Sequence, residues 1–310
     1  MLSKPPTIKS RLPSCWSIQV SEISIDCDFN SVRYVLAAVR RQLASASIEN
    51  PLLDAEWIVS HVLGVGRLKL PLLYARELTT VEIERISRLI DRRTSREPLQ
   101  YVLGNVLFAD LDLRVTSSVL IPRPETEEFF ERIVAMNECP PDRILDLGTG
   151  SGALALGLAR AFTGAEVIAV DQSKAALTLA KENAERNGLK GRVRFLLSDW
   201  MEQVEGKFDL IVSNPPYLDD DEWLSCDPEI RDFEPKVALV AESGDSAADL
   251  MRIVTNAASR LHPGGVLALE TGEGHFACLL ELASQTGYFN PRGFQDLRGC
   301  QRFFFAYWPN

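Results

Sequence analysis

The sequence of 310 residues has only three histidines and six cysteines, and neither set has the spacing of a metal site. No two cysteines form a Cys-x-x-Cys pair, and their scatter along the chain disfavours both a zinc site and a disulfide framework. The histidines His61, His262 and His275 are far apart, so we interpret them as surface or packing residues. We therefore expect no metal, and free thiols in a reducing compartment such as the cytoplasm.

Long apolar runs are also absent. No stretch reaches the roughly 20 apolar residues that cross a bilayer, and residues 1–28 are too polar to form the core of a signal peptide. Hydrophobic residues make up 46% of the chain and charged residues 25%, which is typical of a soluble globular protein. We expect a monomer that makes no contact with a membrane, long enough for two domains.

Positive charge is scarce in the second part of the chain. The net charge is −10, but residues 1–115 carry 15 basic and 13 acidic residues, whereas residues 116–310 carry 18 basic and 30 acidic residues. An acidic C-terminal part repels a phosphate backbone, so we expect no stable complex with a nucleic acid.

Three segments after residue 28 have the periodicity of amphipathic helices. The first begins near Asn30 and Ser31, which we expect to form its N-cap. The second spans residues 51–63, with Leu53 and Trp57 among its inward side chains. In the third, Thr79 and Glu82 have the spacing of a capping box. This helix also carries a row of arginines, which we interpret as a solvated face; a docking surface for an acidic partner is the alternative. The arginines are Arg85, Arg88, Arg92, Arg93 and Arg96.

The pattern changes after residue 98. Apolar runs at residues 101–104, 106–108 and 111–115 predict short strands, and hence a β-hairpin linker. From there, alternating strand and helix patterns predict a parallel sheet with helices on both faces. The predicted organisation is a polar extension at residues 1–28, a helical domain at 29–98, the linker at 99–121 and an α/β domain at 122–310.

One motif stands directly after a predicted buried strand at residues 208–213, and it consists of Asn214, Pro215, Pro216 and Tyr217. Two prolines cannot continue a central strand, so the chain turns at the strand's C-terminal end, where open α/β sheets bind ligands. An amide, a rigid backbone carbonyl and an aromatic ring there suit a planar substrate that carries an NH2 group. A plain loop of turn-forming residues is the alternative. For the acidic run that follows, residues 219–222, we predict a solvated, mobile loop that becomes ordered when substrate binds.

A glycine-rich loop joins the first strand of the α/β part to its helix, and it consists of Asp146, Leu147, Gly148, Thr149, Gly150, Ser151 and Gly152. Asp171 ends the next strand, where a carboxylate can accept hydrogen bonds from ribose hydroxyls. Asp199 and Trp200 follow the third strand and suit an adenine ring and its amine; singly, they also fit a helix cap and a core residue.

Taken alone, the glycine loop also fits a dinucleotide fingerprint, which leaves an NAD-dependent oxidoreductase open. Asp146 argues against this reading, because an ammonium is a better neighbour for it than a phosphate. An ammonium, a ribose and an adenine without a phosphate describe S-adenosylmethionine.

These motifs together resemble those of class I methyltransferases that modify planar amine or amide nitrogens. More narrowly, the chain resembles the release-factor glutamine methyltransferases (HemK/PrmC), in three further stretches at residues 92–104, 120–127 and 233–239. The resemblance covers about residues 30–308. It implies an α/β fold with a class I (Rossmann-like) methyltransferase sheet, preceded by a small helical domain and a β-hairpin linker.

The resemblance also implies an activity, the transfer of a methyl group from S-adenosylmethionine to N5 of the glutamine in the Gly-Gly-Gln motif of peptide-chain release factors. It implies that the glycine loop lines the methionine part of the cofactor, that Asp171 holds the ribose, and that Asp199 and Trp200 hold the adenine. Asn214, next to the cofactor, and the Pro215 carbonyl would grip the substrate amide. Pro216 and Tyr217 would complete the substrate site, with the tyrosine ring packing on the amide. The alternatives are glutamine methylation of a ribosomal protein, N6-adenine methylation of nucleic acid, and a binding module without chemistry.

Overall fold

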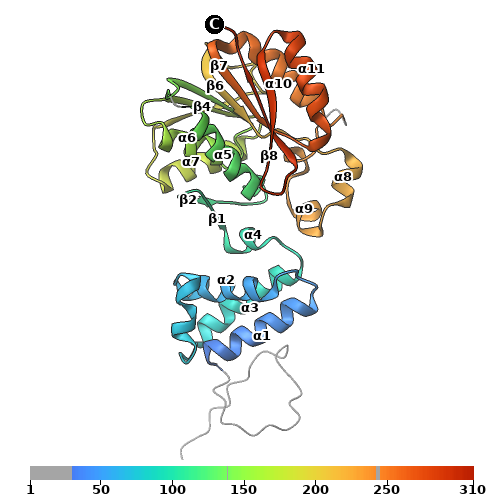
Figure 1. The fold of residues 1–310 in the computed structure, drawn as a ribbon. Coiled ribbons are helices and arrows are strands. Elements are labelled where there is room, and N and C mark those ends of the chain that lie inside the picture. The colour runs from blue at the N-terminus through green and yellow to red at the C-terminus, as the bar shows by residue number, and fades with distance from the viewer. Residues whose placement is uncertain (1–29, 138, 242–244) are drawn as a thin grey trace, which may run out of the picture.

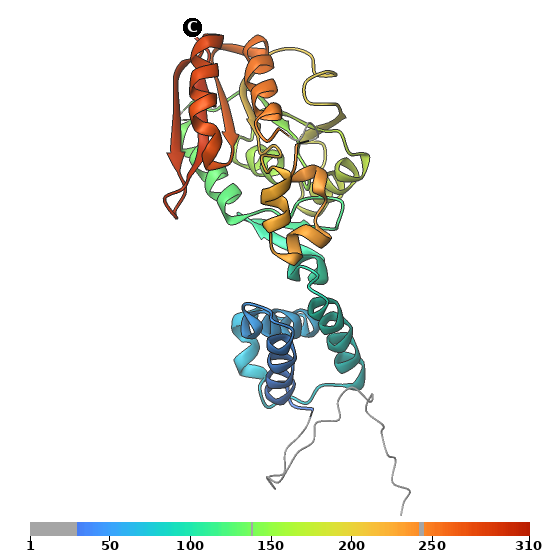
Figure 2. The same cartoon turned by 90° about the vertical axis from the view of Figure 1, so that its right-hand side faces the viewer.

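The computed structural model describes residues 30–137, 139–241 and 245–310. A group of helices near the N-terminus and a larger part built on a β-sheet lie one above the other, joined by α4 and the β1–β2 hairpin (Figures 1 and 2). The extension predicted for residues 1–28 lies outside the described residues. Within the described ranges, none of the helices is long and apolar enough to span a bilayer.

The N-terminal helices pack around one apolar core, and both predicted N-caps are confirmed. Ser31 caps the first helix, because its hydroxyl accepts a hydrogen bond from the Tyr34 backbone N–H at 3.4 Å. Thr79 and Glu82 form the capping box of the third helix. The elements are α1 (Val32–Ser45), α2 (Pro51–Leu63), the 3-10 helix η2 (Arg67–Leu73) and α3 (Thr80–Thr94).

The predicted inward face of α2 is partly wrong. Leu53 and Trp57 are 41% and 37% exposed, whereas Ile58 and Val59 are fully buried. The helix turns its Ile58 side towards the core, and the guanidinium of Arg67 lies over the Trp57 ring, 5.8 Å from its centroid. A tryptophan on the surface can be stabilised by an arginine that lies over its ring, without being buried. The apolar character of Trp57 was therefore not enough to place it on the inward face of the helix.

The arginines of the predicted row are not all solvated: the predicted solvated face is wrong for Arg93, which is buried, and for Arg96, which is half-buried. Arg93 is buried and donates hydrogen bonds to Asp54 at 2.7 Å and to Glu229 at 3.0 Å. Arg96 donates to the same Glu229 at 2.6 Å, and Arg92 pairs with Glu97. Because Glu229 belongs to α9 of the sheet-containing part, the ion pairs that Arg93 and Arg96 form with it bind the two parts of the chain together. Arg85, Arg88 and Arg92 remain exposed, and because Arg92 is paired with Glu97, the docking alternative rests on Arg85 and Arg88.

We expect the substitution Arg93→Met to lower the free energy of unfolding by about 3 kcal/mol, because it leaves the buried Asp54 carboxylate without its cation and leaves Glu229 with Arg96 alone. Arg88→Met on the exposed face of the same helix is the matched control, with an expected change of less than about 0.5 kcal/mol. Urea denaturation of both variants measures the difference. Equal stabilities of the two variants would contradict the structural role of Arg93.

Between the two parts, the structure corrects one prediction and confirms another. Residues 101–104 are not a strand: they lie in the short helix α4 (Leu99–Leu103), which ends at Gly104. Arg92 of α3 donates to the carbonyls of Tyr101 and Val102, at 2.9 and 3.1 Å, and so satisfies carbonyl groups at the end of the helix. The hairpin is confirmed, as β1 (Asn105–Phe108) pairs antiparallel with β2 (Leu111–Arg114).

The sheet has seven strands in the order β5-β4-β3-β6-β7-β9-β8. The first five in this order are parallel, as predicted, whereas β9 pairs antiparallel with both of its neighbours, β7 and β8. The sequence reading did not predict β8, because Asn290, Pro291 and Gly293 interrupt its apolar pattern. The strands are β3 (Arg143–Leu147), β4 (Glu166–Asp171), β5 (Val193–Leu197), β6 (Phe208–Ser213), β7 (Leu261–Glu270), β8 (Phe289–Gln295) and β9 (Gln301–Tyr307).

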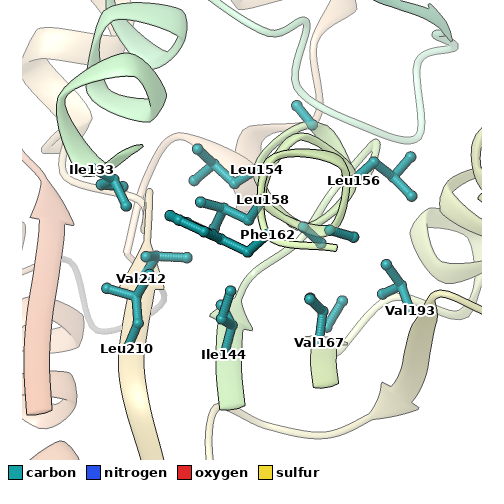
Figure 3. Packing of buried hydrophobic residues seen from close by; sticks show 14 of the residues in the cluster. Ile133, Ile144, Leu154, Leu156, Leu158, Phe162, Val167, Val193, Leu210 and Val212 are labelled. Atoms are coloured by element: carbon teal, nitrogen blue, oxygen red, sulfur yellow. The ribbon is translucent and has the colours of Figure 1, made fainter. Parts of the chain in front are cut away.

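Helices cover both faces of this sheet. One face packs against α5, α6 and α7, and the other against α10 and α11. Figure 3 shows the first face, where Leu154, Leu158 and Phe162 from α6 and the turn after it lie over Ile144 and Val212 of the central strands. The helices are α5 (Pro124–Met136), α6 (Ala153–Ala161), α7 (Lys174–Arg186), α8 (Asp220–Ser225), α9 (Pro228–Phe233), α10 (Ala248–Ala257) and α11 (Phe276–Thr286), with short 3-10 turns at Lys236–Ala238, Ala258–Arg260 and Glu273–His275.

The acidic run at residues 219–222 is a helix start, and the prediction of a mobile loop is wrong. The Asp219 side chain accepts a hydrogen bond from the Glu222 backbone N–H at 2.7 Å, and the Glu222 side chain accepts one from the Asp219 N–H at 3.0 Å. This capping box starts α8. Carboxylates in a first turn stabilise a helix through its dipole, so the run of acidic residues favours the helix that it begins.

Candidate active site

The C-terminal ends of β3, β4, β5 and β6 surround a cavity of about 190 Å³. Because parallel strands all end at the same edge of the sheet, motifs that are far apart in sequence meet there. The predicted residues that line the cavity are Asp146, Gly148, Thr149, Gly150, Ser151, Asp171, Asp199, Trp200, Asn214 and Pro216.

Two glycines of the loop after β3 have different tasks. Gly148 has φ +71°, and a Cβ atom there would lie 3.5 Å from the Trp200 ring, so the missing side chain keeps the cavity open beside the indole. Gly152, predicted as a cofactor residue, does not line the cavity. A Cβ atom on Gly152 would come within 3.2 Å of Ala180 and Leu156, so this glycine serves helix packing.

Asp171 holds the glycine loop in place. One carboxylate oxygen accepts the Gly150 N–H at 2.9 Å, and the other accepts the Ser173 N–H at 2.8 Å. Burial raises the pKa of Asp171, and both backbone hydrogen bonds oppose that rise. Each carboxylate oxygen keeps a further lone pair for a ligand hydroxyl.

Asp146 is the most deeply buried carboxyl of this cavity. Its Oδ2 accepts the Ala155 N–H at 3.2 Å, at the start of α6. Burial raises the pKa of Asp146 to about 7, and the hydrogen bond from the Ala155 N–H opposes the rise. A cation bound in the cavity favours the charged form of such a carboxyl.

Asp199 and Trp200 both form hydrogen bonds with side chains of α10. The sequence did not predict these contacts. Arg252 donates two hydrogen bonds of 3.0 Å to the two oxygens of Asp199. The Trp200 indole N–H donates to Asp249 at 3.1 Å, and Trp200 itself has φ +44°. Arg252 carries the only cationic side chain among the described residues that line the cavity, and it is committed to this ion pair.

A second, smaller cavity of about 40 Å³ lies against the first. Asn214 lines both, whereas Pro215 and Tyr217 line only the smaller one. Arg123 and Glu270 also line the smaller cavity, and sequence reasoning assigned no role to either. The four residues of the motif after β6 thus stand at the neck between two cavities.

The side chain of Asn214 has a defined orientation. Its Nδ2 donates a hydrogen bond to the hydroxyl of Thr126 in α5 at 3.2 Å. The amide oxygen is at the opposite end of the planar group, so it remains available as an acceptor. Thr126 was not singled out from the sequence, because the contact joins residues that are 88 positions apart.

Tyr217 is held as a neutral ring. Arg302 of β9 donates to its hydroxyl at 3.5 Å, and a Cβ atom on Gly272 would lie 3.4 Å from the ring. Burial raises the pKa of the Tyr217 phenol to about 12, and the nearby Glu270 adds to the rise. A tyrosine in this state offers an apolar face and a fixed hydroxyl, but no base.

Two of the family-like stretches contact each other. Arg123, from the stretch at residues 120–127, forms an ion pair with Glu234 of the stretch at residues 233–239. The second oxygen of the buried Glu234 accepts the Ile121 N–H at 3.1 Å. This contact fixes the chain before α5 against the segment after α9, on one side of the smaller cavity. Within the described ranges, no cluster of three His, Cys, Asp or Glu side chains could hold a metal ion.

Two family models match parts of this chain. Residues 35–104 match the family model of the PrmC N-terminal domain, and residues 129–225 match that of the methyltransferase small domain. A solved structure of a methyltransferase from Pyrococcus furiosus is 20% identical in sequence to this chain. The alignment covers 73% of this chain and 99% of that one, with a TM-score of 0.49.

Full-length relatives give the family. The chain is 39% identical over 275 residues to the release factor glutamine methyltransferase of Geobacter sulfurreducens, covering 88% of this chain and 95% of that protein. It is 38% identical over 281 residues to the enzyme of the same name from Moorella thermoacetica, covering 89% of this chain and 98% of that protein. It is 39% identical over 255 residues to the one from Salmonella typhimurium, covering 82% of this chain and 91% of that protein. This chain belongs to the family of release factor glutamine methyltransferases.

Proposed function

We propose that the protein transfers a methyl group from S-adenosylmethionine to the side-chain amide nitrogen N5 of the glutamine in the Gly-Gly-Gln motif of peptide-chain release factors. The observation that carries the proposal is the position of Asn214, which lines both the large cavity and the small one. A cofactor in the first cavity and an amide in the second would meet at its side chain. The relatives named above act, by their names, on release factor glutamine.

The charges of the large cavity fit this cofactor. The carboxylates of Asp146, Asp171 and Asp199 line the cavity, and its one described cation, Arg252, is paired with Asp199. A pyrophosphate would find carboxylates and no free cation here, which disfavours the NAD-dependent alternative. S-adenosylmethionine supplies an electrophilic methyl group on a positively charged sulfur, and its ammonium and sulfonium suit an acidic cavity.

We propose binding residues for the methionine, ribose and adenine parts of the cofactor. Asp146 and the loop from Gly148 to Ser151 would hold the methionine part, and Asp171 would accept hydrogen bonds from the ribose hydroxyls. The Trp200 ring would pack on the adenine. Asp199 would accept from the adenine amine with the lone pairs that Arg252 leaves free.

In the small cavity, the reaction would depend on how the substrate amide is positioned, and not on a base that removes its proton. A primary amide nitrogen is a poor nucleophile because its lone pair is delocalised into the carbonyl. The Asn214 side-chain oxygen and the Pro215 carbonyl would accept its two hydrogens, and Pro216 and Tyr217 would enclose its face. Holding the nitrogen on the line of attack contributes about 7–11 kcal/mol at best.

The same acceptors stabilise the charge that develops. As the nitrogen forms its bond to the methyl carbon, the electrons of the carbon–sulfur bond remain on sulfur, and positive charge builds up on the nitrogen. Carbonyl oxygens that already face the two hydrogens stabilise this charge without reorganisation. The extra proton leaves to water afterwards, so we propose no dedicated base.

We expect cofactor affinity to depend on pH through Asp146. Its pKa is raised to about 7 in the free protein, and a bound cation requires the carboxylate. Below that pH a proton must first leave, so affinity falls by up to roughly tenfold for each pH unit, and above it affinity levels off. Calorimetric titrations with S-adenosylmethionine across this range measure the effect. Asp146→Asn should bind more weakly at high pH and lose most of the dependence; an unchanged slope in the variant would contradict the assignment.

The experiment that tests the function offers methyl-labelled S-adenosylmethionine together with several acceptors. We expect label on an intact release factor and none on a release factor whose Gly-Gly-Gln is changed to Gly-Gly-Ala. Ribosomal proteins and DNA, the acceptors of the alternative functions, should remain unlabelled. Label on DNA or on the Gly-Gly-Ala protein would contradict the proposal. We further propose that the enzyme works as a monomer in the cytoplasm, where release factors act, without a stable nucleic-acid partner.

A further inference from the structure

A buried carboxylate and an arginine connect the β8–β9 hairpin with the tyrosine of the substrate site. Asp296 lies in the turn between these two strands, and Arg302 lies in β9. We propose that both are positioning residues: Asp296 orients the guanidinium of Arg302, and Arg302 holds the Tyr217 hydroxyl, so that the ring packs against the substrate amide at a fixed angle. This inference rests on the proposed function and adds two residues to it.

The topology of the sheet brings the turn to the site. β9 pairs antiparallel with β7, with Phe303 opposite Glu270, and the Thr271 backbone N–H donates to the Arg302 carbonyl at 2.9 Å. The start of β9 therefore lies beside the end of β7, at the same edge of the sheet as the C-terminal ends of β3 to β6. Figure 2 shows the turn between β8 and β9, in dark red, at the lower end of the sheet.

The Asp296 carboxylate has a defined position, because three donors hold it. Its side chain is only 1% exposed. Oδ1 accepts the backbone N–H groups of Arg298 at 2.9 Å and of Cys300 at 3.0 Å, and Oδ2 accepts a hydrogen bond from Nε of Arg302 at 3.3 Å. A buried carboxylate that loses its cation is strongly destabilising. Arg302 therefore neutralises Asp296 and is itself held by it.

The same guanidinium reaches the substrate site. While Nε of Arg302 donates to Asp296, Nη1 donates to the Tyr217 hydroxyl at 3.5 Å. A guanidinium is planar, so its donors keep fixed directions relative to one another. The direction of Nη1 is thus set by the contact of Nε with Asp296. An arginine can only donate, so the Tyr217 oxygen is the acceptor in this bond.

The position of the Tyr217 ring matters for the proposed reaction. The ring lines the small cavity, where it would pack against the glutamine amide. Within the described ranges, Arg302 supplies the one hydrogen bond of the Tyr217 side chain. A reacting group that is misplaced by about 1 Å can lose about a hundredfold in rate. Without the contact from Arg302 the ring can tilt, and the amide that packs on it leaves the line of attack.

A double-mutant cycle on the full-length protein tests whether Arg302 acts through the hydroxyl. With release factor as substrate, Arg302→Met and Tyr217→Phe should each lower kcat by about 10- to 100-fold, while the Kd for S-adenosylmethionine changes by less than about threefold. Phenylalanine lacks the group that Arg302 holds, so the double variant should lie within about threefold of the slower single variant. A double variant slowed by the product of the two single effects would overturn the inference.

Arg292→Met is the matched control. Arg292 belongs to the same hairpin and donates to the hydroxyl of Tyr307 at 3.3 Å, so the substitution removes a contact of the same kind. Tyr307 is the last residue of β9, at the end of the strand away from the site. The control should therefore keep kcat within about twofold of the wild-type value. If Arg302→Met also kept the wild-type kcat, the inference would be wrong.

A second readout needs no substrate. The 13C resonance of the Tyr217 ring carbon that carries the hydroxyl can be identified by its loss in Tyr217→Phe. Asp296→Asn keeps an oxygen for the two backbone N–H groups but turns an NH2 group toward Arg302 in place of an acceptor. We expect the Tyr217 resonance to shift in Asp296→Asn and in Arg302→Met, and to stay in place in Arg292→Met.

A Tyr217 resonance that does not move in Asp296→Asn would contradict the link between the turn and the site. Failure of the proposed function would look different: the wild-type protein would not methylate release factor, while the Tyr217 resonance would still respond to Asp296→Asn.

Discussion

The substitution Asn214→Ala should lower kcat by about a hundred- to a thousandfold, while the Kd for S-adenosylmethionine changes by less than about threefold. The side-chain oxygen of Asn214 contributes mainly as charge develops on the substrate nitrogen, so its loss affects the transition state more than the bound cofactor. Single-turnover methylation of a release factor and calorimetry with the cofactor measure the two quantities separately.

The control for this variant is Asn256→Ala on the exposed face of α10, which should leave both quantities unchanged. Retained melting temperature in Asn214→Ala would exclude a folding defect as the cause of low turnover. A collapse of cofactor affinity with a normal turnover number at saturation would contradict the role assigned to Asn214.

Asp171→Ala should have the opposite signature, in which cofactor binding weakens first, by about a hundredfold. The carboxylate is the proposed acceptor of the ribose hydroxyls, and it also holds the Gly150 and Ser173 N–H groups. A hundredfold change in Kd corresponds to about 2.8 kcal/mol, which matches the loss of one or two hydrogen bonds to a charged group. Calorimetric titration of the variant with S-adenosylmethionine measures it.

Asp91→Ala, which removes an exposed aspartate of α3, serves as the matched control and should bind the cofactor normally. At saturating cofactor, Asp171→Ala should recover much of the wild-type kcat, because the corner around Asn214 is intact. A variant that binds with wild-type affinity would show that the end of β4 does not hold the ribose.

The sequence predicted the parts of the fold that depend on local patterns. The capping box at Thr79, the hairpin after residue 104 and the parallel strands β3 to β7 all have local or periodic signals, and all are present. The motif at the end of β6 could be located from Pro215 and Pro216 alone, because prolines end a central strand.

The errors arose where contacts between distant residues decide the outcome. The short run at residues 101–104 is apolar enough for a strand, but the side chain of Arg92, nine residues before Tyr101, caps it as a helix, which shows that a contact outside the run can decide its structure. Arg93 has the sequence context of a surface residue, yet Asp54 and Glu229 enclose it. Thr126 and Glu270 reach the site from elements remote in sequence, and no spacing rule in a single sequence indicates that they meet Asn214.

The central claim is that Asn214 and Pro215 grip a glutamine amide at the neck between two cavities. A crystal structure with S-adenosylhomocysteine and a Gly-Gly-Gln peptide tests it directly. We predict the glutamine nitrogen within about 3.2 Å of both the Asn214 side-chain oxygen and the Pro215 carbonyl oxygen, with the Tyr217 ring against the amide. A glutamine amide bound elsewhere, with neither oxygen in reach of its nitrogen, would contradict the account.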